Sequence, residues 1–225
     1  MEIPGIYRAV GFDMDGTLLD TDVDYAKMAN LVFDEMVAMG VPENAIDRSG
    51  GAKFNIEAGA RWMMANGMGE KIYEIHGRIA KAARDVEMEN VEAAKPFPGA
   101  VELLKGLRNK GYAVGVLTRG CREYAEAALD IAGVDGYLDA LVARDDFPEE
   151  EAKPSPEAMF HLARSLGVDA PKIIYVGDHA FDYHCAVGAG SGFIGVLSGS
   201  FGESDWRELS ADVALIDSVA RIKLG

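Results

Sequence analysis

Short apolar runs that alternate with helical patterns constrain the fold of this chain more than any other feature. Buried strands are predicted at 7–13, 112–118, 138–143, 173–177, 193–197 and 213–216. Helices are predicted between them, at 98–110, 121–132, 155–166 and 181–189. Strands that are apolar throughout and alternate with helices are typical of a parallel sheet covered on both faces. The pattern therefore predicts an α/β domain.

A helical block interrupts this alternation after the first strand. Apolar residues recur at helical spacing over 24–39, 53–66 and 70–88. No strand pattern is evident from 21 to 95, and the chain length of 225 residues exceeds that of one ordinary domain. We therefore expect a helical domain at 21–95, inserted into an α/β core that is made of 1–20 and 96–225.

The charge balance argues against two classes of partner. The chain carries 22 basic and 37 acidic residues, which gives a formal charge of -15. Nucleic acids and anionic membrane surfaces are bound through basic patches, so neither is expected as a partner. No apolar run approaches the roughly 20 residues that a membrane helix needs. The acidic surface and the lack of a coiled-coil seam favour a monomer or a weak homodimer.

The N-terminal sequence and the cysteines bear on the cellular compartment. The chain does not begin with a basic segment followed by an apolar stretch, as a secretory signal would. Its two cysteines, Cys121 and Cys185, are too few and too far apart for a disulfide framework or a zinc knuckle. We therefore expect a cytoplasmic protein with reduced thiols.

The strongest motif directly follows the first predicted strand. Asp13 ends that strand, Asp15 lies two positions further on, and Gly16 permits a sharp turn that could aim both carboxylates at one point. Ligands of parallel sheets bind beyond the carboxyl ends of the strands. Two adjacent carboxylates favour a bound cation, and Mg²⁺ prefers such oxygen ligands. On this motif alone, a capped turn with incidental acids stays an alternative.

Three further segments carry residues of matching chemistry. Thr118 ends another predicted strand, and its hydroxyl, with the loop that includes Arg119, could hold phosphate oxygens. Lys153 precedes two prolines that would stiffen its loop and aim the side chain. Asp178 ends a third strand, and Asp182 follows it by four residues. By contrast, the run Glu149–Glu151 is expected to be a solvated loop.

Taken in order, these motifs resemble the haloacid dehalogenase-like (HAD) superfamily of phosphotransferases. The match comprises Asp13-Met14-Asp15-Gly16-Thr17, Thr118, Lys153-Pro154, and Gly177-Asp178 with Asp182. The helical insertion resembles the small cap of the subgroup that contains phosphoglycolate phosphatases and β-phosphoglucomutases. The resemblance implies a Rossmann-like parallel-sheet core at 1–20 and 96–225, which is catalytic, and an α-helical cap domain at 21–95, which selects the substrate.

The resemblance also implies roles for the carboxylates. Asp13 would be the nucleophile that forms an aspartyl-phosphate, and Asp15 the general acid and base. Asp13, Asp178 and the backbone carbonyl of Asp15 would hold Mg²⁺, and Asp182 would be a further ligand or would orient the others.

Thr118 and Lys153 would hold the phosphoryl oxygens in this interpretation. Two positions depart from the common pattern of the family. Arg119 stands where many relatives have Asn, and it could contact a substrate phosphate or carboxylate. His179 stands where many have Ser or Thr, and we expect it to hydrogen-bond the backbone of its loop.

The predicted function is that of a Mg²⁺-dependent phosphatase for a small phosphorylated metabolite, of the phosphoglycolate or sugar-phosphate type. A polar, glycine-rich stretch of the cap, 46–53, and the helix after it supply Arg48, Lys53 and Arg61 as candidates for contacting an anionic group of the substrate. A phosphosugar mutase shares every core residue and stays an alternative. A non-catalytic binding protein of the same fold is a remote one.

Overall fold

The computed structural model describes residues 1–224, which form two compact units. One unit comprises Met1–Thr21 together with the chain from Glu92 onward, and the other is Asp22–Val91. The chain therefore leaves the first unit after Thr21 and returns to it some 70 residues later. Each unit is described by itself below.

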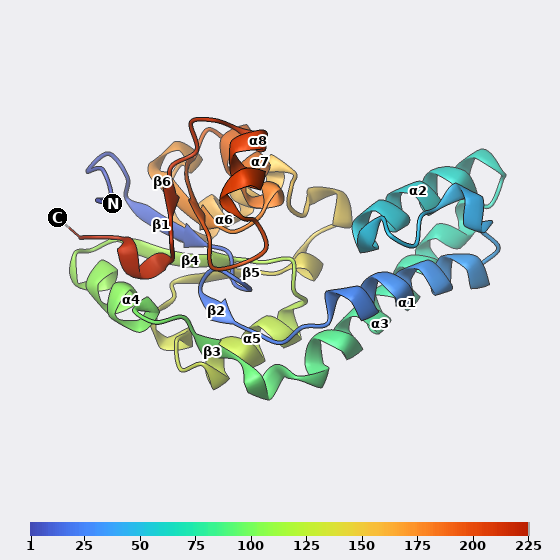
Figure 1. Cartoon of the computed structure of the whole chain (residues 1–225), viewed down its shortest axis with the longest axis horizontal. Helices are drawn as coiled ribbons and strands as arrows, with labels where there is room; N and C mark the ends of the chain where they lie inside the picture. The colour runs from blue at the N-terminus through green and yellow to red at the C-terminus, as the bar shows by residue number, and fades with distance from the viewer. Residues whose placement is uncertain (225) are drawn as a thin grey trace. The chain divides into compact units, whose positions relative to one another are not determined.

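A six-stranded parallel sheet forms the centre of the larger unit (Figure 1). Its strands are β1 (Ala9–Phe12), β4 (Ala113–Leu117), β5 (Ala140–Val142), β6 (Ile173–Gly177), β7 (Gly192–Val196) and β8 (Leu215–Ile216). Their order across the sheet is β5-β4-β1-β6-β7-β8, and every neighbouring pair is parallel. The prediction of an α/β class with a parallel sheet is confirmed.

Helices cover both faces of this sheet. They are α4 (Ala100–Asn109), α5 (Arg122–Ile131), α6 (Pro156–Leu166), α7 (Ala180–Gly188) and α8 (Glu203–Leu209). Figure 1 shows α4 and α5 on one face and α6, α7 and α8 on the other. Short 3₁₀ turns at 135–137, 144–146, 149–151, 170–172 and 219–221 connect these elements.

Three elements were missed by the sequence reasoning. The two-residue strands β2 (Leu19–Asp20) and β3 (Lys95–Pro96) pair in antiparallel fashion where the chain leaves and re-enters the larger unit. A two-residue strand is too short to produce an alternating pattern. Apart from Lys95 at its end, the block 21–95 contains no strand, as expected. The helix α8 was also missed, since only Trp206 among its residues is buried.

The smaller unit is helical, with α1 (Tyr25–Ala38), α2 (Gly51–Ala65) and α3 (Ile72–Glu89). Three short 3₁₀ turns, at 43–45, 69–71 and 91–93, accompany them. Val32, Phe33, Met36 and Met63 form the centre of its core. Tyr25, the first residue of α1, is 56% exposed.

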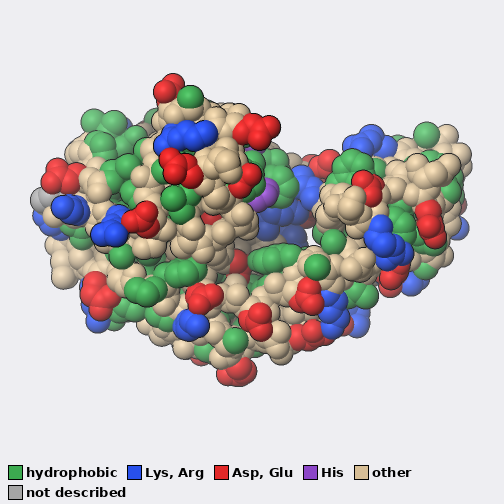
Figure 2. Space-filling model, viewed as in Figure 1, with side chains coloured by type: hydrophobic (Ala, Val, Ile, Leu, Met, Phe, Trp, Pro, Cys, Tyr) green, Lys and Arg blue, Asp and Glu red, His purple; other side chains and the backbone are tan. Residues whose placement is uncertain are grey.

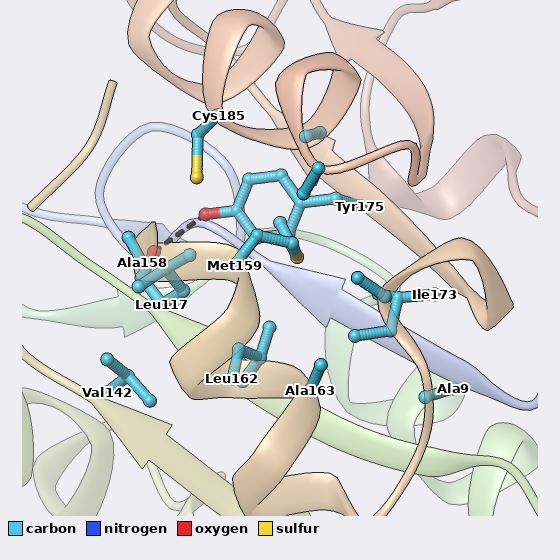
Figure 3. Packing of buried hydrophobic residues seen from close by; sticks show 13 residues of the cluster. Ala9, Leu117, Val142, Ala158, Met159, Leu162, Ala163, Ile173, Tyr175 and Cys185 are labelled. Atoms are coloured by element: carbon cyan, nitrogen blue, oxygen red, sulfur yellow. Dashed lines mark hydrogen bonds between the residues drawn. The ribbon is translucent and has the colours of Figure 1, made fainter. Parts of the chain in front are cut away.

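Two facing glycines let α6 approach the sheet closely. Gly11 of β1 lies beside Gly115 of β4 in the sheet register. A methyl group added at Gly11 would meet the Tyr175 ring at 2.7 Å and Leu162 at 2.9 Å, and one added at Gly115 would meet Leu162 at 2.7 Å. Figure 3 shows Leu162 and Tyr175 in this cluster, with the Tyr175 hydroxyl bonded to the Leu117 carbonyl at 2.7 Å. The two glycines therefore allow the Tyr175 ring to pack directly on the sheet.

On the face drawn in Figure 2, acidic and basic side chains are interspersed over both units. Among the described residues, no helix combines the length and apolar character needed to cross a bilayer.

We predict that Gly11→Ala destabilises the protein by about 1–3 kcal/mol, because the added methyl group overpacks the contact with Tyr175 and Leu162. Guanidinium unfolding followed by circular dichroism would measure the change. Gly136→Ala is the control, since a methyl group there meets nothing within 4 Å. An unfolding free energy for Gly11→Ala equal to that of the control would contradict the prediction.

Candidate active site

Three adjacent strands end in polar side chains at one edge of the sheet. Asp13 follows β1, Thr118 follows β4 and Asp178 follows β6. The strand β1 lies between the other two, with Phe12 in register with Val116 and Val176. All three polar side chains are buried. The parallel topology thus brings Asp13 together with two residues that are more than 100 positions away from it in the chain.

Lys153 lies at the centre of this group, and its side chain is 3% exposed. Its ammonium nitrogen Nζ donates to Asp13 Oδ1 at 2.5 Å and to Asp182 Oδ1 at 2.7 Å. A third contact joins Nζ to the Tyr175 hydroxyl at 3.2 Å. The Lys153–Pro154 peptide bond is cis. One buried cation therefore connects a loop, the end of β1 and the helix α7.

Burial and charge act in opposite directions on these groups. Burial raises the pKa of the Asp13 carboxyl well above its usual range; the Lys153 ammonium opposes that rise, while Asp182, Asp178 and Asp15 reinforce it. Burial likewise raises the pKa of Asp182. Burial by itself would lower the pKa of Lys153, but the two carboxylates raise it above its usual value. The Lys153 ammonium and its two carboxylate partners thus favour one another's charged forms.

Backbone groups fix the Asp178 carboxylate. Ser200 donates its amide N–H to Asp178 Oδ2 at 2.6 Å. Gly16 has a φ of 77°, and a methyl group there would meet the same oxygen at 2.7 Å. At Gly199 the corresponding distance is 2.1 Å. Gly16 is required both by its left-handed backbone and by the carboxylate packed against it.

Asp182 is held by the start of α7. Its Oδ2 accepts the amide N–H groups of Asp178 at 3.2 Å and of His179 at 3.0 Å. His179 in turn accepts the Phe181 N–H on Nδ1 at 3.2 Å, so the expectation that it bonds the backbone of its loop is confirmed. Burial lowers the pKa of the His179 imidazole.

The Asp15 carboxylate has a different environment. Its Oδ1 accepts from the Thr21 hydroxyl at 2.7 Å and from the Tyr124 hydroxyl at 2.6 Å. Sequence reasoning missed both donors, as it missed Tyr175. A signal existed for the two tyrosines, because a tyrosine in a buried position needs a hydrogen-bond partner for its hydroxyl.

The loop after β4 is joined to the Lys153 segment. Thr118 Oγ1 accepts the Gly120 amide N–H at 2.9 Å. The Arg119 guanidinium donates to the Lys153 carbonyl at 2.5 Å and to Glu149 at 2.6 Å. The position of Arg119 as a phosphate ligand therefore stays a prediction, and its contacts in the structure are to the chain itself.

The acidic run before Lys153 corrects the expectation of a solvated loop. It forms a 3₁₀ turn, Glu149–Glu151, in which Glu149 binds Arg119 and Glu151 binds the ring of His161 at 2.6 Å. His161 is buried and stacks on Phe147. Carboxylates that look surplus in the sequence thus anchor the segment that carries Lys153.

The cap candidates all lie in the smaller unit and pair with its own carboxylates. Arg48 binds Asp34 at 2.8 Å and Lys53 binds Glu57 at 2.9 Å. Arg61 lies 4.0 Å from Glu57 and is largely exposed. A substrate contact by any of these three residues stays a prediction.

Three buried carboxylates fit a divalent cation. Asp13, Asp178 and Asp182 each offer an oxygen, and these oxygens lie within 4.8 Å of one another. Hard cations such as Mg²⁺ prefer this donor set. The Asp15 carboxylate is not part of this cluster and accepts hydrogen bonds from hydroxyl groups. Asp15 is expected to bind the cation through its backbone carbonyl.

The fold and the site together fit an enzyme of the parallel α/β type with a buried carboxylate at a strand end. The family model of haloacid dehalogenase-like hydrolases matches residues 10–196. The chain belongs to this family, which confirms the resemblance seen in its motifs and the expectation of an enzyme.

Relatives of known name cover nearly the whole chain. The plasmid phosphoglycolate phosphatase of Cupriavidus necator is 30% identical over 94% of this chain and 89% of its own length. The phosphoglycolate phosphatase of Aquifex aeolicus is also 30% identical, over 82% of each chain. A HAD family hydrolase from Deinococcus radiodurans, solved with bound phosphate and sodium, has a TM-score of 0.60 at 18% identity and covers 95% of this chain and 93% of its own. At that identity the solved structure supports the fold alone.

We predict that Lys153→Met costs about 3–5 kcal/mol of unfolding free energy, because it leaves buried carboxylates without their cation. The second substitution in Lys153→Met/Asp182→Asn should recover part of that loss by removing one charge. Guanidinium unfolding in buffer with a metal chelator would measure both. If Lys153→Met stays within about 0.5 kcal/mol of the wild type, the buried ion pairs do not stabilise the unit.

Proposed function

We propose that this protein is a Mg²⁺-dependent phosphatase that hydrolyses a small phosphorylated metabolite through an aspartyl-phosphate. The observation that carries the proposal is the convergence of the Asp13 carboxylate, the Thr118 hydroxyl and the Lys153 ammonium at one buried edge of the sheet. A nucleophile next to a fixed cation and a hydroxyl suits phosphoryl transfer, in which positioning and charge stabilisation supply most of the rate.

The proposed reaction has two steps. The Asp13 carboxylate attacks phosphorus while the bond to the leaving oxygen breaks, and Asp15 gives its proton to that oxygen, so that an alcohol leaves. Water then attacks phosphorus and gives a proton to Asp15, and the bond between phosphorus and Asp13 breaks to release phosphate. Thr118 and Lys153 hold the phosphoryl oxygens in both steps.

Asp13, Asp178 and the backbone carbonyl of Asp15 would hold Mg²⁺, with Asp182 as a further ligand or as a group that orients them. When bound, the ion would offset the negative charge of the phosphoryl group and of the carboxylates around it. Lys153 already supplies one positive charge there, which supports a site for an anion in a chain of net charge -15.

The substrate class rests on the relatives. Those named phosphoglycolate phosphatase support a small phosphate ester with a further anionic group, for which Arg119 or the cap residues Arg48, Lys53 and Arg61 would supply positive charge. The cap at 21–95 would select the substrate. A phosphosugar mutase uses the same core residues and stays the second candidate. A cytoplasmic location and a monomer or weak homodimer stay predictions.

We predict that Asp13→Asn lowers kcat at least about 10³-fold, because the amide cannot act as the nucleophile. The melting temperature should stay within a few degrees of the wild type. Acid quenching of the wild type during turnover, followed by peptide mass spectrometry, should find a phosphoryl group on Asp13. Asp217→Asn, which changes an exposed carboxylate of the same unit, is the control. Substantial activity of Asp13→Asn would exclude the covalent route.

We also predict that hydrolysis of a panel of phosphorylated metabolites requires Mg²⁺. Chelation should abolish phosphate release, and added Mg²⁺ should restore it. Release of free phosphate without a sugar bisphosphate favours the phosphatase, whereas a requirement for the bisphosphate favours the mutase. With the preferred ester, Arg48→Gln, Lys53→Gln and Arg61→Gln test the cap: a raised KM for at least one of them is expected, and unchanged KM values for all three would remove the cap residues from the site.

A further inference from the structure

The hydroxyl of Tyr124 contacts the site. Tyr124 lies in the first turn of α5, directly after the loop that carries Thr118, and it is 1% exposed. Its hydroxyl donates to Asp15 Oδ1 at 2.6 Å. The two residues are 109 positions apart in the chain, so only the tertiary fold brings them together.

The ring of Tyr124 packs against the loop that carries Thr118. A methyl group added at Gly120 would meet ring atoms Cδ1 at 2.8 Å and Cε1 at 3.2 Å. Gly120 also donates its amide N–H to Thr118 Oγ1. The Tyr124 ring therefore packs against the loop that carries Thr118, while the hydroxyl of the same residue binds Asp15. The distance between Thr118 and Asp15 depends on this tyrosine.

We propose that Tyr124 is a positioning residue for proton transfer by Asp15, an inference that rests on the proposed function. Both hydroxyls, from Tyr124 and Thr21, donate to Oδ1 of Asp15. In the first step the Asp15 carboxyl gives its proton to the leaving oxygen as the P–O bond breaks, and in the second step the carboxylate takes a proton from the attacking water.

A hydroxyl suits this role in both states of Asp15. It donates to Oδ1 of the carboxylate, and it donates equally to the carbonyl oxygen of the protonated acid, so the carboxyl keeps its orientation throughout the cycle. A proton transfer needs a hydrogen-bond distance to the leaving oxygen, and a rotated carboxyl would lose that distance.

A second buried tyrosine provides a matched contrast. Tyr175 also lies within the core, but its hydroxyl contacts the Leu117 carbonyl (Figure 3) and Lys153 Nζ. Loss of the Tyr175 hydroxyl would displace Lys153, which holds the phosphoryl oxygens. Because every phosphate ester has these oxygens, all esters would be affected alike. Loss of the Tyr124 hydroxyl would affect only esters whose leaving group must be protonated.

The test compares Tyr124→Phe with the wild type on two esters, an alkyl phosphate and p-nitrophenyl phosphate, with Mg²⁺ present. The value of kcat/KM reports the step in which the leaving group departs. An alkoxide needs a proton to leave and p-nitrophenolate hardly does. We expect kcat/KM for the alkyl ester to fall about tenfold or more, and that for the aryl ester to fall at most about twofold.

Two further variants make the result specific. Tyr175→Phe should lower kcat/KM for both esters by the same factor. Thr21→Val, which removes the other donor to Oδ1, should show the selectivity of Tyr124→Phe and serves in its place if that variant does not fold. An equal loss on both esters, or no loss, in the folded variant would overturn the positioning role alone. Absence of turnover by the wild type on either ester and on the metabolite panel would overturn the proposed function and the positioning role with it.

Discussion

The structure of the site depends on one buried lysine. Lys153 compensates two carboxylates that would be too costly to bury alone, and in doing so it joins three parts of the chain that are distant in sequence. The end of β1, the start of α7 and the loop before α6 all converge on its ammonium group. The remaining interactions of the site follow from the need to hold this cation and its partners in place.

Support for Lys153 comes from several directions. The Tyr175 hydroxyl contacts its ammonium group from β6, and the close packing over Gly11 sets where that ring lies. Arg119 binds the Lys153 carbonyl, and through Glu149 it also binds the turn just before it. Arg119, which is a candidate substrate ligand in the sequence, therefore contributes to the geometry of the Lys153 loop. A rigid loop suits a reaction whose rate depends on the placement of charge.

The central carboxylates, the strand-end threonine and the lysine could be predicted from the sequence, because each follows a recognisable apolar strand or stands in a stiff proline-containing loop. The parallel topology brings these side chains together, since neighbouring parallel strands end at one edge of the sheet. The roles of Glu149 and Glu151 could not be predicted. Nothing local distinguishes a carboxylate that binds an arginine or a histidine far along the chain from one that binds water.

The sequence by itself determined the fold class, the insertion of a helical block and the identity of the groups gathered at the sheet edge, because apolar periodicity and motif order are local properties. Only the tertiary structure decided which partners those groups have. Tyr124 contacts Asp15 and Lys153 lies between two carboxylates because helices pack on a sheet at distances that side-chain volumes set. The contacts of Asp15 with Tyr124 and of Asp13 with Lys153 join residues over 100 positions apart, and no pattern within a segment encodes them.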